Sequence, residues 1–292
     1  MKRFDDYEDD TESFSKRKDR RKPRQRRSVH ELRAAGPGGM FRDPGLQHLY
    51  EEGLLTELLG ELKSGKEATV YLARGPRGLL AAKLYSDMAA RSFKRDGIYR
   101  QGRYVGSARL EKAIAQRSRT GLDAQQALWI LHEYAQLWQL QQAGVPAPRP
   151  LVGPGPEACS RAGRVVLMEF IGDEDGAAPR LADVRLGEEE AASAWRQSLD
   201  IMAKLLALGK IHGDYSTYNL LWWQGRVVVI DFPQMVGVAE NPDARTLLEQ
   251  DVTSLCKSFR PHGITADPRA VWTEVVGRGQ GAQAGAPGTP IL

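Results

Sequence analysis

The sequence predicts an α+β protein of two lobes, with an antiparallel sheet in the N-terminal lobe and a small set of helices in the C-terminal lobe. The order of the patterns supports this class, because strand-like runs joined by a turn come first and segments with helical periodicity follow. The β-branched run "VVVIDF" between two helical segments marks the junction of the lobes. The chain has 292 residues, of which 41% are hydrophobic, and this is enough for one large domain or two lobes.

The elements of the N-terminal lobe are expected between residues 46 and 171. Leu46 to Leu62 is leucine-rich and amphipathic, which favours a short helix leading into the domain. The runs "ATVYLA", Ala68 to Ala73, and "LLAAKLY", Leu79 to Tyr85, flank the turn-forming stretch "RGPRG". This pattern predicts a β-hairpin. "RVVLMEFIG", Arg164 to Gly172, predicts a further strand that ends in a glycine.

Four longer helices are expected, and the last three of them place the C-terminal lobe at residues 172–276. Asp123 is the predicted N-cap of the first helix, and Gly144 and Pro146 end it. The second helix has acidic residues in its first turn and ends near Gly209. Its apolar positions recur at helical spacing: Trp195, Leu199, Met202 and Leu206. The predicted bounds are Ala124 to Ala143, Glu188 to Lys210, Pro242 to Phe259, and Pro268 to Val276.

Three segments are expected to lie outside these elements. Residues 1–45 form a predicted disordered arm, in which "KRKDRRKPRQRR", Lys16 to Arg27, is strongly basic and lacks apolar residues. Residues 91–120 are a basic, partly mobile insertion without a clean period, and residues 277–292 are a flexible Gly/Ala/Pro-rich tail. A basic arm attracts the phosphates of nucleic acid, so the arm is either an RNA-binding element or a solubilising tail without a specific partner.

The cysteines and the hydropathy of the chain indicate the compartment. Cys159 and Cys256 are far apart in the sequence and fit neither a disulfide framework nor a metal-binding motif. No apolar run approaches the roughly 18 residues that a membrane-spanning helix needs. The chain is therefore expected to be a soluble, cytoplasmic protein that does not bind membranes.

The stretch "IHGDYSTYNLLWWQGRVVVIDF", Ile211 to Phe232, carries the clearest chemical pattern. Asp214 and Asn219 lie close together, and Asp231 follows at the end of the expected strand. Two carboxylates and an amide beside a buried strand need a compensating charge, and a divalent cation supplies it directly. Phosphoryl transfer from ATP uses this order, with one aspartate for the hydroxyl proton and an asparagine and an aspartate for Mg²⁺. The alternative is that these residues only cap a turn and a strand end.

Polar residues upstream of this stretch are candidates for binding a nucleotide. Lys83 lies in an otherwise apolar strand, where a buried ammonium needs a partner, and Glu133 in the long helix is the predicted partner. This ion pair would orient Lys83 onto the α- and β-phosphates, whereas the alternative is a lysine that reaches water at the edge of the strand. In "SGKEATVYLA", the turn amides, Ser64 and Lys66 are candidate phosphate donors, and a plain hairpin is the alternative.

Taken together, these motifs resemble the RIO family of atypical protein kinases, and they are closest to its type-one branch. The combination of the "SGKEA" turn, the "AGVPAPRP" link and the "HGDYSTYN" loop is more specific than any single motif. The resemblance spans about residues 61–259 and is carried by "SGKEATVYLA", "AAKLY", "RSFKRDGIYRQGR", "HEYAQLWQLQQAGVPAPRPL", "VVLMEFIG", "APRLADVRL" and "IHGDYSTYNLLWWQGRVVVIDFPQMV".

The resemblance implies a two-lobed protein-kinase-like fold with a reduced helical C-terminal lobe, and ATP with Mg²⁺ or Mn²⁺ as cofactors. The implied nucleotide-binding residues are Ser64, Lys66, Lys83, Glu133, Met168 beside the adenine, and the backbone groups of Glu169 and Ile171. The implied catalytic residues are Asp214, Lys83 and Asp231, and the implied metal ligands are Asn219 and Asp231.

The sequence departs from the family pattern after Asp231. "DFPQ" stands where the family has a small residue followed by Ser-Gln, so the geometry of the loop at Phe232 and Pro233 is open. "HGD" also replaces the commoner "HAD", and Gly213 occurs in the aminoglycoside and choline phosphotransferases as well. Some RIO proteins are ATPase-like switches in ribosome maturation that form a phospho-aspartate at the position matching Asp231. Asp231 would then be a nucleophile as well as a metal ligand.

The expected function is that of a Mg²⁺-dependent, ATP-binding serine kinase or ATPase of the RIO type. Its acceptor would be another protein or the chain itself, at Ser13, Ser15, Ser28 or Asp231. A role in maturation of the small ribosomal subunit is expected, with ribosomal RNA or a pre-ribosomal subunit as the partner of the basic arm. Two alternatives stand beside it: a phosphotransferase for small molecules, of the aminoglycoside or choline type, and a nucleotide-gated RNA-binding assembly factor with little turnover.

Overall fold

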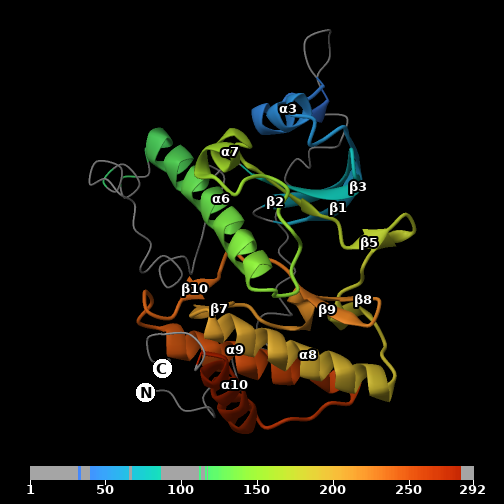
Figure 1. The fold of residues 1–292 in the computed structure, drawn as a ribbon, viewed down its shortest axis with the longest axis vertical. Helices are drawn as coiled ribbons and strands as arrows, with labels where there is room; N and C mark the ends of the chain where they lie inside the picture. Colours follow the sequence, from blue (N-terminus) through green and yellow to red (C-terminus); the bar gives the residue numbers. More distant parts are fainter. Residues whose placement is uncertain are drawn as a thin grey trace, which may run out of the picture.

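The computed structural model describes residues 32–33, 40–65, 68–86, 112, 116 and 118–283. This part of the chain forms two lobes, a sheet with helices packed on it and, below it in Figure 1, a layer of helices. The predicted two-lobed α+β architecture is confirmed. The elements of the first lobe are α3 (Pro44–Glu51), β1 (Glu57–Ser64), β2 (Ala68–Gly75), β3 (Gly78–Tyr85), α6 (Arg119–Gln142), α7 (Pro156–Arg161) and β4 (Val165–Glu169).

The described strands of the first lobe make a four-stranded antiparallel sheet in the order β1-β2-β3-β4. The predicted hairpin is confirmed, since β2 and β3 pair without a break from Ala68↔Tyr85 to Gly75↔Gly78. Gly75 needs its lack of a side chain, because a Cβ there would lie 2.6 Å from the Leu54 carbonyl oxygen. β4 ends at Glu169, three residues before the predicted end at Gly172.

The predicted helix over Leu46 to Leu62 is correct only in its first half. α3 covers Pro44–Glu51, with the Asp43 side chain accepting hydrogen bonds from the first turn. The rest of the segment forms β1, whose Leu58 is buried and pairs with Ala73 of β2. The spacing of the leucines is compatible with a helix or a strand. This segment forms a strand because the edge of β2 supplies hydrogen-bond partners for its backbone.

α6 begins earlier than predicted. Its N-cap is Ser118, whose Oγ accepts a hydrogen bond from the Gly121 amide at 3.1 Å, so Asp123 lies inside the helix instead of capping it. The helix buries the apolar side chains of Ile130, Leu137 and Leu140. Most of the predicted insertion, residues 91–120, lies outside the described residues, but its last two residues belong to α6.

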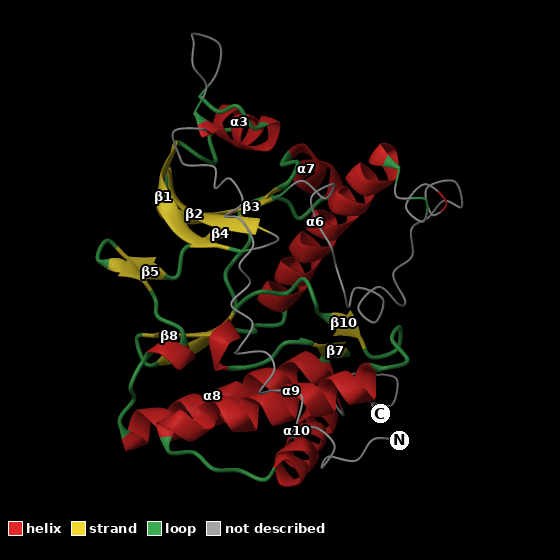
Figure 2. Cartoon of the chain, turned by 180° about the vertical axis from the view of Figure 1, so that it is seen from behind, coloured by secondary structure: helices red, strands yellow, loops and turns green. Residues whose placement is uncertain are grey.

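The second lobe holds three long helices in its described part, which run beneath short paired strands (Figure 2). α8 buries Leu199, Met202 and Leu206, and each such side chain contributes about 1.5–3 kcal/mol relative to exposure. The elements of this lobe are β5 (Gly172–Asp173), β6 (Gly176–Ala177), η3 (Leu181–Asp183), α8 (Glu188–Ala207), β7 (Lys210–Ile211), η4 (Thr217–Asn219), β8 (Leu220–Trp223), β9 (Arg226–Val229), β10 (Val236–Gly237), α9 (Ala244–Phe259), η5 (Arg260–His262) and α10 (Pro268–Gln283).

Three predicted boundaries of the second lobe are wrong. α8 ends at Ala207, since Gly209 adopts a φ of +66°, and Lys210 belongs to β7. α9 begins at Ala244, two residues after the predicted start. α10 continues past Val276 to Gln283, and in this extension Arg278 forms ion pairs with Asp200 of α8 and with Glu274. The helix therefore extends into the segment that was expected to be a flexible tail.

The run "VVVIDF" belongs to a hairpin and not to a single strand. β8 and β9 pair from Leu220↔Val229 to Trp223↔Arg226, and the two residues between them, Gln224 and Gly225, have φ values of +50° and +77°. Positive φ at both positions is typical of the tight turn that suits the twist of a hairpin. β9 ends at Val229, so Asp231 lies two residues beyond the strand.

Candidate active site

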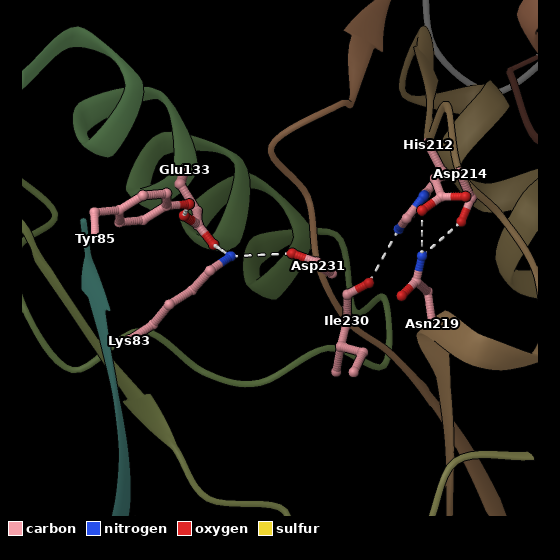
Figure 3. A network of polar contacts seen from close by, with 8 residues as sticks. All are labelled: Lys83, Tyr85, Glu133, His212, Asp214, Asn219, Ile230 and Asp231. Atoms are coloured by element: carbon pink, nitrogen blue, oxygen red, sulfur yellow. Dashed lines mark hydrogen bonds and ion pairs between the residues drawn. The ribbon is translucent and has the colours of Figure 1, made fainter. Parts of the chain in front are cut away.

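Lys83 lies at the contact between the two lobes. It is buried on β3, and its Nζ lies 2.8 Å from Glu133 Oε1 on α6 and 3.0 Å from Asp231 Oδ1 (Figure 3). Burial alone would lower the pKa of Lys83, but the charges of Glu133 and Asp231 outweigh it and hold the pKa well above its ordinary value. Lys83 is thus charged and doubly paired, which confirms the predicted ion pair with Glu133 and excludes a lysine that reaches water at a strand edge.

Glu133 is held in place from two sides. The hydroxyl of Tyr134 donates to the Val165 carbonyl at 3.0 Å and accepts from the Leu167 amide at 2.9 Å, which fixes α6 against β4. The hydroxyl of Tyr85 donates to Glu133 Oε2, the carboxylate oxygen that Lys83 does not use (Figure 3). Burial raises the pKa of Tyr85 well above its ordinary value, so the phenol keeps its proton.

Tyr85 is a site residue that the sequence interpretation missed. It lies two residues after Lys83 on the same strand, and Lys83 Nζ lies 5.2 Å from the centre of its ring. The alternation of side chains along a strand places both residues on one face of the sheet. The spacing from Lys83 was the available signal, but only the packing of α6 shows that the hydroxyl meets Glu133.

Asp231 adopts a strained backbone conformation. Its φ is +73°, a left-handed value that is uncommon for residues other than glycine and costs about 1–3 kcal/mol. The charge of Lys83 lowers the pKa of the Asp231 carboxyl, so the group is ionised at neutral pH. Its side chain is 44% exposed and remains accessible to a ligand. The next residue, Phe232, is buried and packs edge-on against the ring of His212, with 5.6 Å between centroids.

Asp214 and Asn219 form the second part of the site. The amide nitrogen of Asn219 donates to the Asp214 backbone carbonyl at 2.8 Å and to Asp214 Oδ2 at 2.9 Å. The side-chain oxygen of Asn219 therefore points away from Asp214 (Figure 3). Partial burial raises the pKa of Asp214, which makes its carboxylate a better proton acceptor.

His212 orients the loop that carries Asp231. Its Nε2 lies 3.1 Å from the Ile230 carbonyl oxygen and donates to it, and its Nδ1 is buried without a partner among the described residues. Burial lowers the pKa of His212 to about 4, so the ring is neutral at physiological pH. The contact joins the Asp214 loop to the Asp231 loop.

Asp251 on α9 is a second residue that the sequence interpretation missed. Its carboxylate accepts hydrogen bonds from the Gly213 amide at 2.8 Å and from the Tyr215 amide at 2.9 Å, the two residues that flank Asp214. Burial raises the pKa of Asp251 to about 7. Gly213 has a φ of +81°, so a glycine in the "HGD" motif avoids the strain that another residue would bring here. Nothing in the local sequence around Asp251 indicates this contact.

Comparison with known proteins decides the family. The sequence model of the RIO domain family matches residues 69–271, which is more than half of the chain. The chain belongs to the RIO family. A RIO-type serine/threonine-protein kinase Rio1 from Haloferax volcanii is 32% identical over 232 residues, which cover 78% of this chain and 72% of that protein.

Two further relatives carry similar names. The RIO-type serine/threonine-protein kinase Rio1 of Thermoplasma acidophilum is 33% identical over 141 residues, covering 48% of this chain and 68% of the relative. The serine/threonine-protein kinase RIO1 of Homo sapiens is 28% identical over 215 residues, covering 73% of this chain but only 35% of the human protein. The chain thus spans about a third of the length of the human relative.

Four residues of this RIO chain that were expected to bind a nucleotide lie on or directly after β3 and β4: Lys83, Met168, Glu169 and Ile171. Met168 is half-buried and pairs with Ala81, on the face of the sheet that carries Lys83. The Glu169 amide donates to the Arg149 carbonyl at 2.8 Å, so of its backbone groups only the carbonyl remains for adenine. The Ile171 carbonyl accepts from Ala178 at 2.9 Å, which leaves its amide.

The two polar side chains expected in the "SGKEA" turn are not both brought to this face. Lys66 lies outside the described residues. Ser64 ends β1, and its hydroxyl is 3.2 Å from the Thr69 hydroxyl. Ser64 pairs with Thr69 of β2, and Thr69 pairs with Leu84 of β3. Leu84 follows Lys83 directly in the strand, so the row of Ser64, Thr69 and Leu84 faces the side of the sheet opposite to Lys83.

The donor set of the RIO chain fits a magnesium ion. Among the described residues, no three His, Cys, Asp or Glu side chains come together as a metal-binding cluster. The ionised, accessible carboxylate of Asp231 and the side-chain oxygen of Asn219 are hard oxygen ligands. Mg²⁺ is commonly held by one or two such ligands, with water and phosphate oxygens completing its shell. Asn219 and Asp231 therefore suit Mg²⁺ bound together with a nucleotide.

Three other features of the described chain bear on function. A cavity of about 480 Å³ is lined by residues in and beside α3, α6 and α7 and contains none of the candidate site residues, so it is separate from the candidate nucleotide site. Both cysteines are buried and unpaired. Among the described helices, none is long and apolar enough to cross a membrane.

Proposed function

We propose that this chain is a serine kinase or ATPase of the RIO type that uses ATP with Mg²⁺ or Mn²⁺. The observation that carries the proposal is the chain of contacts from Glu133 through Lys83 to Asp231, with Asp214 and Asn219 joined beside it. Its relatives are named serine/threonine-protein kinases, which supports the proposed kinase function. ATP and a protein acceptor, or the chain itself, are the proposed substrates.

Each residue has a role in the proposed transfer to a serine. Lys83, oriented by Glu133, binds the α- and β-phosphates, while the Glu169 carbonyl, the Ile171 amide and Met168 receive the adenine. Bound Mg²⁺ would neutralise charge on the phosphates, held by Asn219 and Asp231. Asp214 orients the acceptor hydroxyl and takes its proton as the serine oxygen bonds to the γ-phosphorus. The bond between the γ-phosphorus and the bridging oxygen breaks, and ADP leaves.

The carboxylate of Asp231 is a candidate acceptor in its own right. It is ionised and 44% exposed, and attack of a carboxylate oxygen on the γ-phosphorus would give a phospho-aspartate and ADP. Hydrolysis of that acyl phosphate would complete an ATPase cycle. The serine acceptors Ser13, Ser15 and Ser28 lie outside the described residues.

A small-molecule phosphotransferase and a non-catalytic RNA-bound factor are the competing functions. In the described C-terminal lobe, α9 begins only 13 residues after Asp231, and this connection is too short for a substrate-binding helical insert between them. The lobe therefore favours a protein acceptor. The basic arm lies outside the described residues, and its binding to ribosomal RNA, a role in small-subunit maturation and a cytoplasmic location remain parts of the proposal.

The test is incubation with Mg²⁺ and γ-labelled ATP, with and without small ribosomal subunits. Wild type is compared with Asp214→Asn, Asp231→Asn and the control Asp175→Asn, which makes the same change at an exposed turn. Acid-stable label that is lost in Asp214→Asn indicates a serine kinase. Acid-labile label that is lost only in Asp231→Asn indicates an aspartyl-phosphate cycle. Absence of both label and phosphate release, with ATP bound, contradicts a catalytic function in this assay.

A further inference from the structure

The register of the sheet brings a second lysine onto the face that carries Lys83. Lys63 of β1 pairs with Val70 of β2, and Val70 pairs with Lys83 of β3. Residues directly opposite one another in antiparallel strands share a face, so the two lysines lie in one row, two strands and about 10 Å apart at their backbones. Met168, expected beside adenine, lies on this face as well, through its pairing with Ala81.

A bulge in β1 produces this placement. The register moves from Glu61↔Tyr71 to Lys63↔Val70, so one extra residue is accommodated between them. As a result, Lys63, and not Ser64, lies on the face of the sheet that carries Lys83. Ser64 faces the other side, with its hydroxyl bonded to Thr69.

The aspartates of the site lie beside the face of the sheet that carries Lys63. Lys83 Nζ is 3.0 Å from Asp231 Oδ1, so Asp231 lies against the row that Lys83 shares with Lys63. Asp214 belongs to the neighbouring loop, which His212 joins to the Asp231 loop through the Ile230 carbonyl. The exposed Lys63 therefore lies on the side of the sheet that borders the space in front of these two loops. In the proposed transfer, the terminal phosphoryl group lies in this space.

We propose that Lys63 is a phosphate-binding residue that contacts the terminal phosphoryl group of ATP. This inference rests on the proposed function and adds to it a residue outside the predicted set. Lys83 is already paired with Glu133 and Asp231, whereas the exposed Lys63 is a flexible point charge that can follow the phosphate as it moves between donor and acceptor. An ammonium placed where negative charge gathers stabilises both bound ATP and the transfer.

The test measures the affinity for the β,γ-imido analogue of ATP and for ADP, each with Mg²⁺, by titration calorimetry. The variants are Lys63→Met, Lys63→Arg and the control Arg77→Met, which removes one positive charge from the exposed β2–β3 turn of the same sheet. We expect Lys63→Met to weaken binding of the analogue about tenfold, the size of a lost charged hydrogen bond, and to change ADP binding less than twofold. Lys63→Arg restores most of the affinity, and Arg77→Met binds both nucleotides as wild type does.

The outcomes separate this inference from the proposed function. Wild-type affinity of Lys63→Met for the analogue overturns the role of Lys63 while leaving the proposed function intact. An equal loss for the analogue and for ADP also overturns it, because a general disturbance of β1 would act on the binding of both nucleotides. If wild type binds neither nucleotide, the proposed function fails and this inference fails with it. Thermal unfolding of each variant checks that the fold is retained.

Discussion

Replacing Tyr85 by phenylalanine removes one hydroxyl group from the interior and leaves the ring over Lys83 in place. The hydroxyl donates to Glu133 Oε2, and both side chains are about 2% exposed, so water cannot replace the lost donor. A hydrogen bond to a charged group contributes about 1.5–3 kcal/mol, and a buried acceptor left without a partner has a similar cost. We therefore expect Tyr85→Phe to lower the free energy of unfolding by roughly 2 kcal/mol. For a chain of this size that corresponds to a fall of roughly 3–4 °C in Tm.

Calorimetric melting of Tyr85→Phe, Glu133→Gln and the double variant measures this contact directly. The double-mutant cycle isolates the coupling between the two side chains, and we expect it to exceed about 1 kcal/mol. Tyr50→Phe is the matched control, because its side chain is 37% exposed and the same change there is expected to stay within about 0.5 kcal/mol. A Tyr85→Phe variant as stable as Tyr50→Phe, with no coupling to Glu133, would refute the assignment.

Three further predictions concern the contacts of the loops. Lys83→Met leaves the carboxylates of Glu133 and Asp231 without their cation, so labelling by γ-labelled ATP should fall at least about 100-fold while circular dichroism still reports a folded chain. Gly213→Ala places a side chain at a φ of +81°, so denaturant titration should show a loss of about 1 kcal/mol. Asp251 has a pKa raised from 3.8 to about 7, so the folded state binds the extra proton and the contribution of Asp251 to stability falls as pH rises through this window. The difference in unfolding free energy between wild type and Asp251→Asn should therefore shrink from pH 4 to pH 7. A constant difference would contradict a buried carboxyl that binds a proton in this range. His212 makes stability change with pH in the opposite direction, but it does so in both proteins, so its effect cancels in the difference.

The sequence by itself indicated the main residues of the candidate site. Asp214, Asn219 and Asp231 follow in a fixed order along a short stretch, and Lys83 is a single charge in an apolar strand. Such signals are local, because the residue types and their spacing limit the chemistry that they can perform. The hairpin of β2 and β3 and the buried face of α8 were predictable for the same reason, since hydrophobic periodicity depends on near neighbours in the chain.

The tertiary structure alone decided which residues support those of the motifs. Asp251 contacts the loop of Asp214 from α9, and Tyr85 meets Glu133 only because Tyr134 fixes α6 against β4. The strand β1 and the C-terminal half of α10 likewise depend on partners outside their own segments, the edge of β2 and Asp200 of α8. A segment whose own preferences are balanced takes the conformation in which its backbone and charges find partners, and those partners are known only when the chain is folded.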